Sequence, residues 1–205
     1  MRLNKKVCLW LAASLAINVL TYNGTRLLTS NWYHYDMTTA IEQSIPFVPW
    51  TITVYLGCYL FWICNYAMGC FQEEKKAVRF LASECFAKFI CCLCFIIIPT
   101  TNVRPQVIGE DVFSRAMRWL YCTDAADNLF PSIHCLTSWF CVIAVRNQKT
   151  ISSWYKYLSV VLALAVCVST LTTKQHVLPD VVVGVLLAEI CYRLIPFIYP
   201  FSRLF

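Results

Sequence analysis

The chain has 205 residues, of which 59% are hydrophobic and 14% are charged, and its formal net charge is +6. This composition is far too apolar for an ordinary soluble domain and indicates an integral membrane protein. It also argues against a nucleic-acid-binding role, because no basic patch stands apart from the flanks of the apolar segments.

Six apolar segments follow one another along the chain, each long enough or nearly long enough to cross a bilayer core as a helix. The first begins with basic residues, as a signal peptide does, but Tyr22–Arg26 is a poor cleavage site, so we expect this segment to be retained. We therefore predict an all-α bundle of six transmembrane helices in a single domain, residues 1–205. The expected helices cover residues 7–23, 47–70, 78–99, 129–145, 155–173 and 178–197.

The distribution of lysine and arginine predicts the orientation of this bundle. With six spans, 11 of these residues fall on the side that holds both termini and five on the other side, while Lys88 lies inside a span. The positive-inside rule then makes both termini cytoplasmic in a multi-pass protein, at the plasma membrane if the cell is bacterial. The loops at about 24–46 and 100–128 become extracytoplasmic.

The longer of these two loops holds most of the polar residues outside the spans. Residues 112–121 could form an interfacial helix within it. Asp124 and Asp127 follow that helix, and we expect them to be solvated loop residues or helix caps. The 13 cysteines lie almost entirely in apolar segments, which favours packing over disulfides, and no metal or cofactor is expected.

Two of the three histidines stand where an apolar segment begins on the external side. Ser132 and His134 fall in the first turns of the fourth segment, while His176 and Asp180 flank the start of the sixth. Helix N-termini carry unpaired N–H groups and the positive end of a dipole, so two of them at one surface form an anion site. Arg104, just after the third segment, brings positive charge to the same level.

These residue types suit phosphoryl transfer without a metal. We expect His176 to be the nucleophile and Asp180, four residues on, to hold its imidazole in the correct tautomer. His134 would protonate the leaving oxygen and later activate water or an acceptor hydroxyl. The residues expected to bind the substrate phosphate are Arg104, Ser132 and Lys174.

At these residues the chain resembles the type 2 phosphatidic acid phosphatase superfamily, whose three motifs read Lys-x6-Arg-Pro, Pro-Ser-Gly-His and Ser-Arg-x5-His-x3-Asp. The second motif appears as Pro131–His134, the third keeps His176 and Asp180, and the first keeps Arg104 and Pro105. The six-helix core of the family matches the number of predicted spans. The resemblance implies an enzyme acting on a lipid phosphate, with His176 as the nucleophile.

The chain also departs from these motifs. Ile97 stands where the first motif has lysine, Thr170 where the third has arginine, and Ile133 where the second has glycine. Lys174 could supply the missing charge. The string from Asn128 to His134 looks more like inositol phosphorylceramide synthases, whose motif is Phe-Pro-Ser-Leu-His and which, like the related sphingomyelin synthases, transfer head groups between lipids.

Three hypotheses therefore stay open: hydrolysis of a lipid phosphate or pyrophosphate, transfer of a phospho-head group to an acceptor hydroxyl, and a degenerate membrane protein without catalysis. The expected partners are the lipid phosphate and the bilayer. Two charged pairs lie inside predicted spans at i,i+4, Glu84 with Lys88 and Glu189 with Arg193. Such charges are often functional, but here we favour structural pairs facing other helices.

Overall fold

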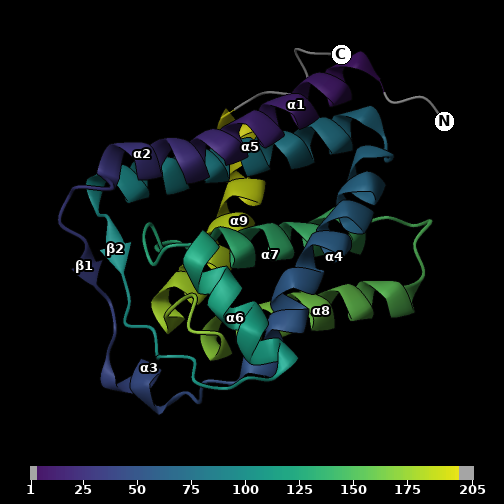
Figure 1. The fold of residues 1–205 in the computed structure, drawn as a ribbon. Coiled ribbons are helices and arrows are strands. Elements are labelled where there is room, and N and C mark those ends of the chain that lie inside the picture. Colours follow the sequence, from purple (N-terminus) through teal and green to yellow (C-terminus); the bar gives the residue numbers. More distant parts are fainter. Residues whose placement is uncertain (1–3, 199–205) are drawn as a thin grey trace.

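The structure, a computed structural model, describes residues 4–198 and is built almost entirely of helices (Figure 1). Its helical elements are α1 (Lys5–Val19), a π-helical turn (Leu20–Gly24), α2 (Thr25–Thr29), α3 (Ala40–Ser44), a 3₁₀ turn (Pro49–Thr51), α4 (Ile52–Cys70), α5 (Glu74–Ile97), α6 (Val112–Thr123), α7 (Ile133–Arg146), α8 (Ser153–Thr172) and α9 (Leu178–Ile198). The strands β1 (Tyr35–Asp36) and β2 (Thr100–Thr101) form a parallel pair.

Among residues 4–198, five helices are long and apolar enough to cross a membrane. The first combines α1, the π turn and α2 into Lys5–Thr29, which is longer than expected, and the others are Pro49–Cys70, α5, α8 and α9. The all-α prediction is confirmed, but six full spans are not. The fourth apolar segment contains only α7, whose 14 residues extend about 21 Å, against roughly 30 Å for a bilayer core.

Helix α7 is short because the chain before it is not helical. Pro131 cannot donate a backbone hydrogen bond, and Ser132 caps the helix in an extended conformation. The helix is nevertheless central, since it packs against α4, α5, α8 and α9, and ten of its residues are buried. Irregular backbone at membrane depth is tolerated where protein surrounds it, and the segment before α7 meets this condition.

One end of the bundle gathers the starts of α1 and α5 and the end of α9. Lys6 pairs with Glu74 at 3.7 Å, and Nη2 of Arg79 donates to the carbonyl of Tyr192 at 2.9 Å. The two ends of the described chain therefore lie on the same side of the bundle, as the six-segment topology requires. Their cytoplasmic location stays a prediction.

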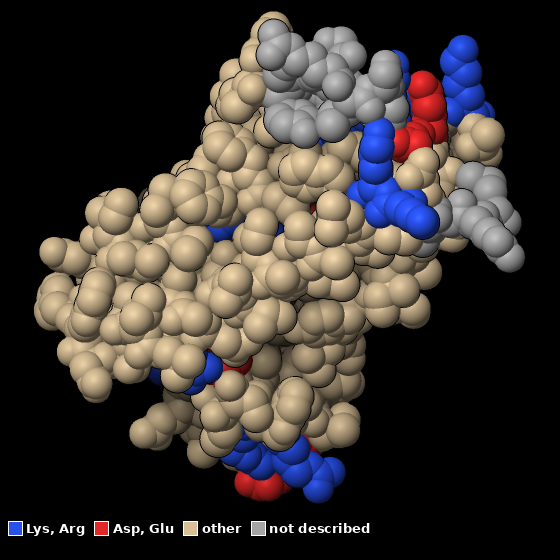
Figure 2. Space-filling model, turned by 90° about the horizontal axis from the view of Figure 1, so that it is seen from above, with Lys and Arg blue, Asp and Glu red and all other residues tan. Residues whose placement is uncertain are grey.

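The outer surface is apolar over wide areas. Leu27 is 82% exposed and Phe197 is 86% exposed. Figure 2 shows a broad face almost free of charged side chains, with the large groups of Lys, Arg, Asp and Glu gathered at its upper right and its lower edge. Exposed apolar surface of this extent fits contact with lipid rather than water.

At the other end of the bundle, the two loops expected to be extracytoplasmic are joined to each other. Tyr35 of β1 pairs with Thr100 of β2, directly after the end of α5. The backbone N–H of Val103 donates to Oγ1 of Thr38 at 2.9 Å. These contacts fix the course of the chain just before Arg104 and so help to position that side chain.

Candidate active site

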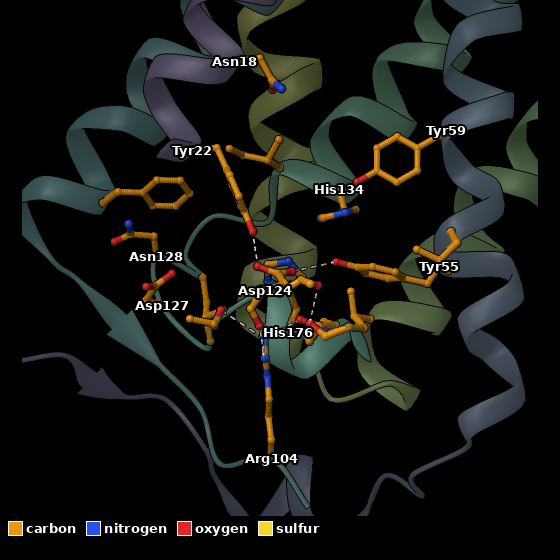
Figure 3. Close-up of a pocket in the computed structure, with 18 of the residues that line it drawn as sticks. Asn18, Tyr22, Tyr55, Tyr59, Arg104, Asp124, Asp127, Asn128, His134 and His176 are labelled. Atoms are coloured by element: carbon orange, nitrogen blue, oxygen red, sulfur yellow. Dashed lines mark hydrogen bonds between the residues drawn. The ribbon is translucent and has the colours of Figure 1, made fainter. Parts of the chain in front are cut away.

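His134 and His176 lie next to each other on the wall of one cavity, with their ring centroids 6.0 Å apart. The cavity has a volume of about 260 Å³ and is lined by residues from several helices and from the loop after α6. In Figure 3, Asn18 and Tyr59 lie at one end of it, Arg104 lies at the opposite end, and both histidines lie between them. The two histidines singled out from the sequence thus belong to one site.

His134 is the second residue of α7, and the start of this helix sets its position. The ring stacks on Tyr55 at 4.6 Å between centroids and lies 5.5 Å from the ring of Trp62. Its Nε2 atom is buried, with no hydrogen-bond partner among residues 4–198. Ser132 is fully buried and its Oγ accepts from the N–H of Cys135 at 3.3 Å, so this hydroxyl caps α7 and does not line the cavity.

His176 lies two residues before α9, and its orientation comes from that helix. Nδ1 of His176 lies 3.2 Å from Oδ2 of Asp180, which leaves Nε2 free for the cavity that His176 lines. Burial on its own would lower the pKa of His176, but the hydrogen bond and negative charge of Asp180 outweigh it, and the pKa is raised. The expected pairing of this histidine with a carboxylate is therefore present.

Close packing of α7 against α9 brings the two histidines together. The N–H of Ser132 donates to the carbonyl of Asp180 at 3.1 Å. A Cβ atom placed on Gly184 would lie only 2.6 Å from the carbonyl oxygen of Ser132. Glycine at position 184 therefore permits a backbone approach that a larger residue would prevent.

The start of α9 differs from the expected anion site. The N–H of Val177 donates to Oδ2 of Asp180 at 3.1 Å, and the N–H of Leu178 donates to Oε1 of Glu42 at 3.2 Å. Two carboxylates of the chain itself thus take the positive end of this helix, where the dipole favours negative charge. The backbone N–H groups of Val177 and Leu178 are therefore already paired and are not available to a phosphate.

Arg104 lines the cavity, and its guanidinium is largely buried. It donates to the carbonyls of Asp124 and Ala125 and to Oε1 of Gln175, and it lies 4.8 Å from the ring centroid of Tyr121. Its Nε has no partner within the described part of the chain. Burial lowers the pKa of Arg104, and the nearby Asp124 partly offsets this shift.

Lys174 is not brought into the cavity of the two histidines. It has a positive φ of 55°, and its Nζ donates to the carbonyls of Ile45, at 2.5 Å, and Glu42. It lines a second cavity of about 370 Å³, which also touches His176. The position of Lys174 fits a role in holding the loop around α3 better than the expected contact with phosphate.

Among the cavity residues that the sequence did not single out, Asp124 and Gln175 lie next to Arg104. Asp124, expected to be a solvated loop residue or cap, lines the cavity and accepts hydrogen bonds from the hydroxyls of Tyr22 and Tyr55. Gln175, which had drawn no prediction, has a buried Nε2 without a partner in residues 4–198, while its Oε1 binds Arg104. The sequence signal for Gln175 was its place beside His176. Asp127, the other loop aspartate, pairs with Arg26 at 3.2 Å.

A comparison with models of protein families matches residues 76–203 to the PAP2 superfamily, which is more than half of the chain. The matched range contains Arg104, His134, His176 and Asp180. Neither the curated proteins nor the solved structures contain a match to this chain.

Proposed function

This chain belongs to the PAP2 superfamily, whose members are generally phosphatases or phosphotransferases, and we propose that it hydrolyses a lipid phosphate or lipid pyrophosphate at the extracytoplasmic face of a membrane. The observation that carries this proposal is the pair of neighbouring histidines, His134 and His176, which line one cavity. Nucleophilic phosphoryl transfer needs two such groups, one to attack phosphorus and one to move protons.

In the first step, Nε2 of His176 attacks phosphorus and forms a P–N bond while the P–O bond to the lipid breaks. Protonated His134 gives its proton to the leaving lipid oxygen. Asp180 holds Nδ1 of His176 at 3.2 Å and stabilises the positive charge that develops on the ring. The products of this step are a phosphorylated His176 and the lipid alcohol, or the lipid monophosphate when the substrate is a lipid pyrophosphate.

In the second step, neutral His134 takes a proton from water, whose oxygen attacks phosphorus. The P–N bond breaks, inorganic phosphate leaves, and His176 returns to its neutral form. Proton transfer by His134 therefore serves both steps in opposite directions, as general acid–base catalysis requires.

Arg104 and Gln175 are proposed to bind the phosphate oxygens during these steps. Both have a buried nitrogen without a partner among the described residues, Nε in Arg104 and Nε2 in Gln175. Buried donors without partners are costly, and a phosphate in the cavity would satisfy them. Ser132 is proposed to act through the start of α7, which it caps.

The second cavity favours a second candidate function, transfer of the phosphoryl head group to an alcohol. At about 370 Å³ it has room for much more than a water molecule, and it reaches His176 beside Lys174 and Asn102. An acceptor hydroxyl bound there would replace water in the second step. Hydrolysis and transfer share the phosphohistidine and differ only in the attacking oxygen.

The test is to incubate the detergent-purified protein with phosphatidic acid, an isoprenyl pyrophosphate and mixed phospholipids, with EDTA present. We expect free phosphate from the wild-type protein and none from His176→Ala. His34→Ala is the matched control, because His34 lies in the external loop and does not line the cavity. A new phospholipid without free phosphate would establish transfer.

Two results would contradict the proposal that the protein is an enzyme. One is equal inertness of wild-type protein and His176→Ala across the panel, together with no vanadate binding that depends on His176. The other is full activity in His176→Ala. Phosphate release that EDTA abolishes would contradict the expectation that no metal takes part.

A further inference from the structure

A groove of about 280 Å³ lies beside the cavity of the two histidines. The two spaces share three lining residues, Asn18 of α1 and Tyr59 and Trp62 of α4, so they are direct neighbours and a ligand in one lies next to the other. At the mouth of the groove, Leu15 is 60% exposed and Ile63 is 68% exposed. On an apolar helical surface such as this one, these side chains face lipid, and the groove therefore opens towards the hydrocarbon.

The inner wall of this groove is polar. Nζ of Lys88 lies 2.6 Å from Oε1 of Glu84, and Oγ of Ser14 donates to Oε2 of Glu84 at 2.6 Å. Both charged residues are buried, and both line the groove. An ammonium group has three donors, so Lys88 keeps hydrogen-bonding capacity beyond its bond to Glu84.

Thr137 is the second polar feature of the groove. It is only 6% exposed, and its Oγ1 has no hydrogen-bond partner in the described part of the chain. A threonine inside a membrane helix normally bonds back to a carbonyl of the preceding turn, and a buried hydroxyl without a partner is costly. Thr137 lines the groove, so a group bound there could supply the missing partner.

We propose that this groove binds the linkage region of the lipid substrate, and that Thr137 donates a hydrogen bond to an ester or amide carbonyl there, with Lys88 as the deeper donor. The hydrocarbon chains would then leave between α1 and α4 into the bilayer. This inference rests on the proposed function and narrows its substrate to a lipid phosphate that carries a carbonyl near the phosphate.

The spacing along the helices supports this assignment. Thr137 follows His134 by three residues, which is about 4.5 Å along the axis of α7. Lys88 precedes Phe95, a residue of the histidine cavity, by seven residues, or about 10 Å along α5. In acylated lipids the carbonyl lies a few bonds from the phosphate, whereas an isoprenyl phosphate has only hydrocarbon at that point.

The test uses the full-length His176→Ala protein, so that binding is measured without turnover. Phosphatidic acid with brominated chains quenches tryptophan fluorescence when it binds, because Trp62 lines both spaces. Ceramide phosphate and a polyprenyl phosphate then compete for the site. Each measurement is repeated with Thr137→Val, which removes only the hydroxyl, and with Thr137→Ser, which keeps it.

We expect Thr137→Val to weaken phosphatidic acid and ceramide phosphate about two- to tenfold and to leave the polyprenyl phosphate unchanged. Thr137→Ser should bind like the parent protein. A loss for only one of the two acylated lipids identifies an ester or an amide as the partner. Equal changes for all three lipids, no change for any of them, or no binding of phosphatidic acid overturns the inference. Failure of the proposed enzyme is a separate result, since it requires inertness in the wild-type protein.

Discussion

The ring centroids of His134 and His176 lie 6.0 Å apart, although the two residues belong to different helix starts. At this distance the two rings are close neighbours, so one phosphate bound beside them could touch both, and the proposed mechanism gives each ring a separate task. The two tasks can be separated experimentally.

Replacing His134 by alanine should affect the two chemical steps differently. With a lipid substrate the rate should fall by about 10²- to 10⁴-fold, because the leaving oxygen is no longer protonated. With an activated phosphate ester, whose leaving group needs no proton, the first step should recover and phosphohistidine should accumulate. Acid-labile labelling from a radioactive phosphate ester measures this. Absence of label in His134→Ala and the same rate loss for both substrates would contradict the assignment of His134.

The pairing of His176 with Asp180 predicts the pH dependence of activity. Asp180 raises the pKa of His176, so the ring keeps its proton to a higher pH than usual. Only the neutral ring attacks phosphorus, so with the activated phosphate ester, which needs no proton from His134, kcat/KM should rise with pH through a midpoint above about 6.5. In Asp180→Asn, the negative charge that offsets the effect of burial on the pKa of His176 is removed. The midpoint should therefore move to lower pH while the maximal rate falls. An unchanged midpoint in this variant would argue against His176 as the nucleophile.

Gln175 and Lys174 form a matched pair for testing which neighbour of His176 binds phosphate. Gln175→Glu keeps an acceptor for Arg104 but loses the Nε2 donor and adds negative charge, so inhibition by vanadate should weaken at least about tenfold. Lys174→Met should leave vanadate inhibition within about twofold of wild type while lowering Tm, because Nζ holds the carbonyls of Glu42 and Ile45. The reverse pattern would restore Lys174 as a phosphate ligand.

The approach of α7 to α9 can be tested with two glycines. Gly184→Ala would set a methyl group 2.6 Å from the carbonyl oxygen of Ser132, and we expect a loss of about 1–3 kcal/mol in stability together with reduced activity. Gly57→Ala is the control, since nothing lies within 4 Å of a Cβ there, and it should be neutral or stabilising. Thermal unfolding in detergent measures both. Equal Tm values for Gly184→Ala and Gly57→Ala would show that α7 and α9 can move apart without loss of stability.

The helical fold could be predicted because apolar length alone identifies a membrane helix. The fourth segment was already among the shortest in the sequence, but the sequence did not reveal that its helix begins only at Ile133, because residues 129–132 precede the helix and are not helical. Similarly, the first helix continues past residue 23 through a π-helical turn and α2, although its sequence becomes more polar.

The two histidines could be predicted because each stands at a helix start, and the topology brings those starts to one surface. Gln175 and Asp124 could not, because their places depend on how Arg104 ties the loop after α6 to the segment before α9. Lys174 was assigned from charge and proximity in sequence. In the structure, Lys174 has a left-handed backbone conformation, and its side chain lines the second cavity instead of the cavity of the two histidines.

The short α7 has one more consequence, which concerns the free energy needed to bring a lipid phosphate to the histidines. Under the predicted topology, a helix about 9 Å shorter than the bilayer core that reaches the cytoplasmic end of the bundle would start below the level of the external head groups, with His134 at that depth. Withdrawing acyl chains from a bilayer costs about 0.8 kcal/mol for each methylene group. With the proposed proton donor His134 near the depth of an ester bond, the substrate would keep its chains in the membrane throughout the proposed reaction.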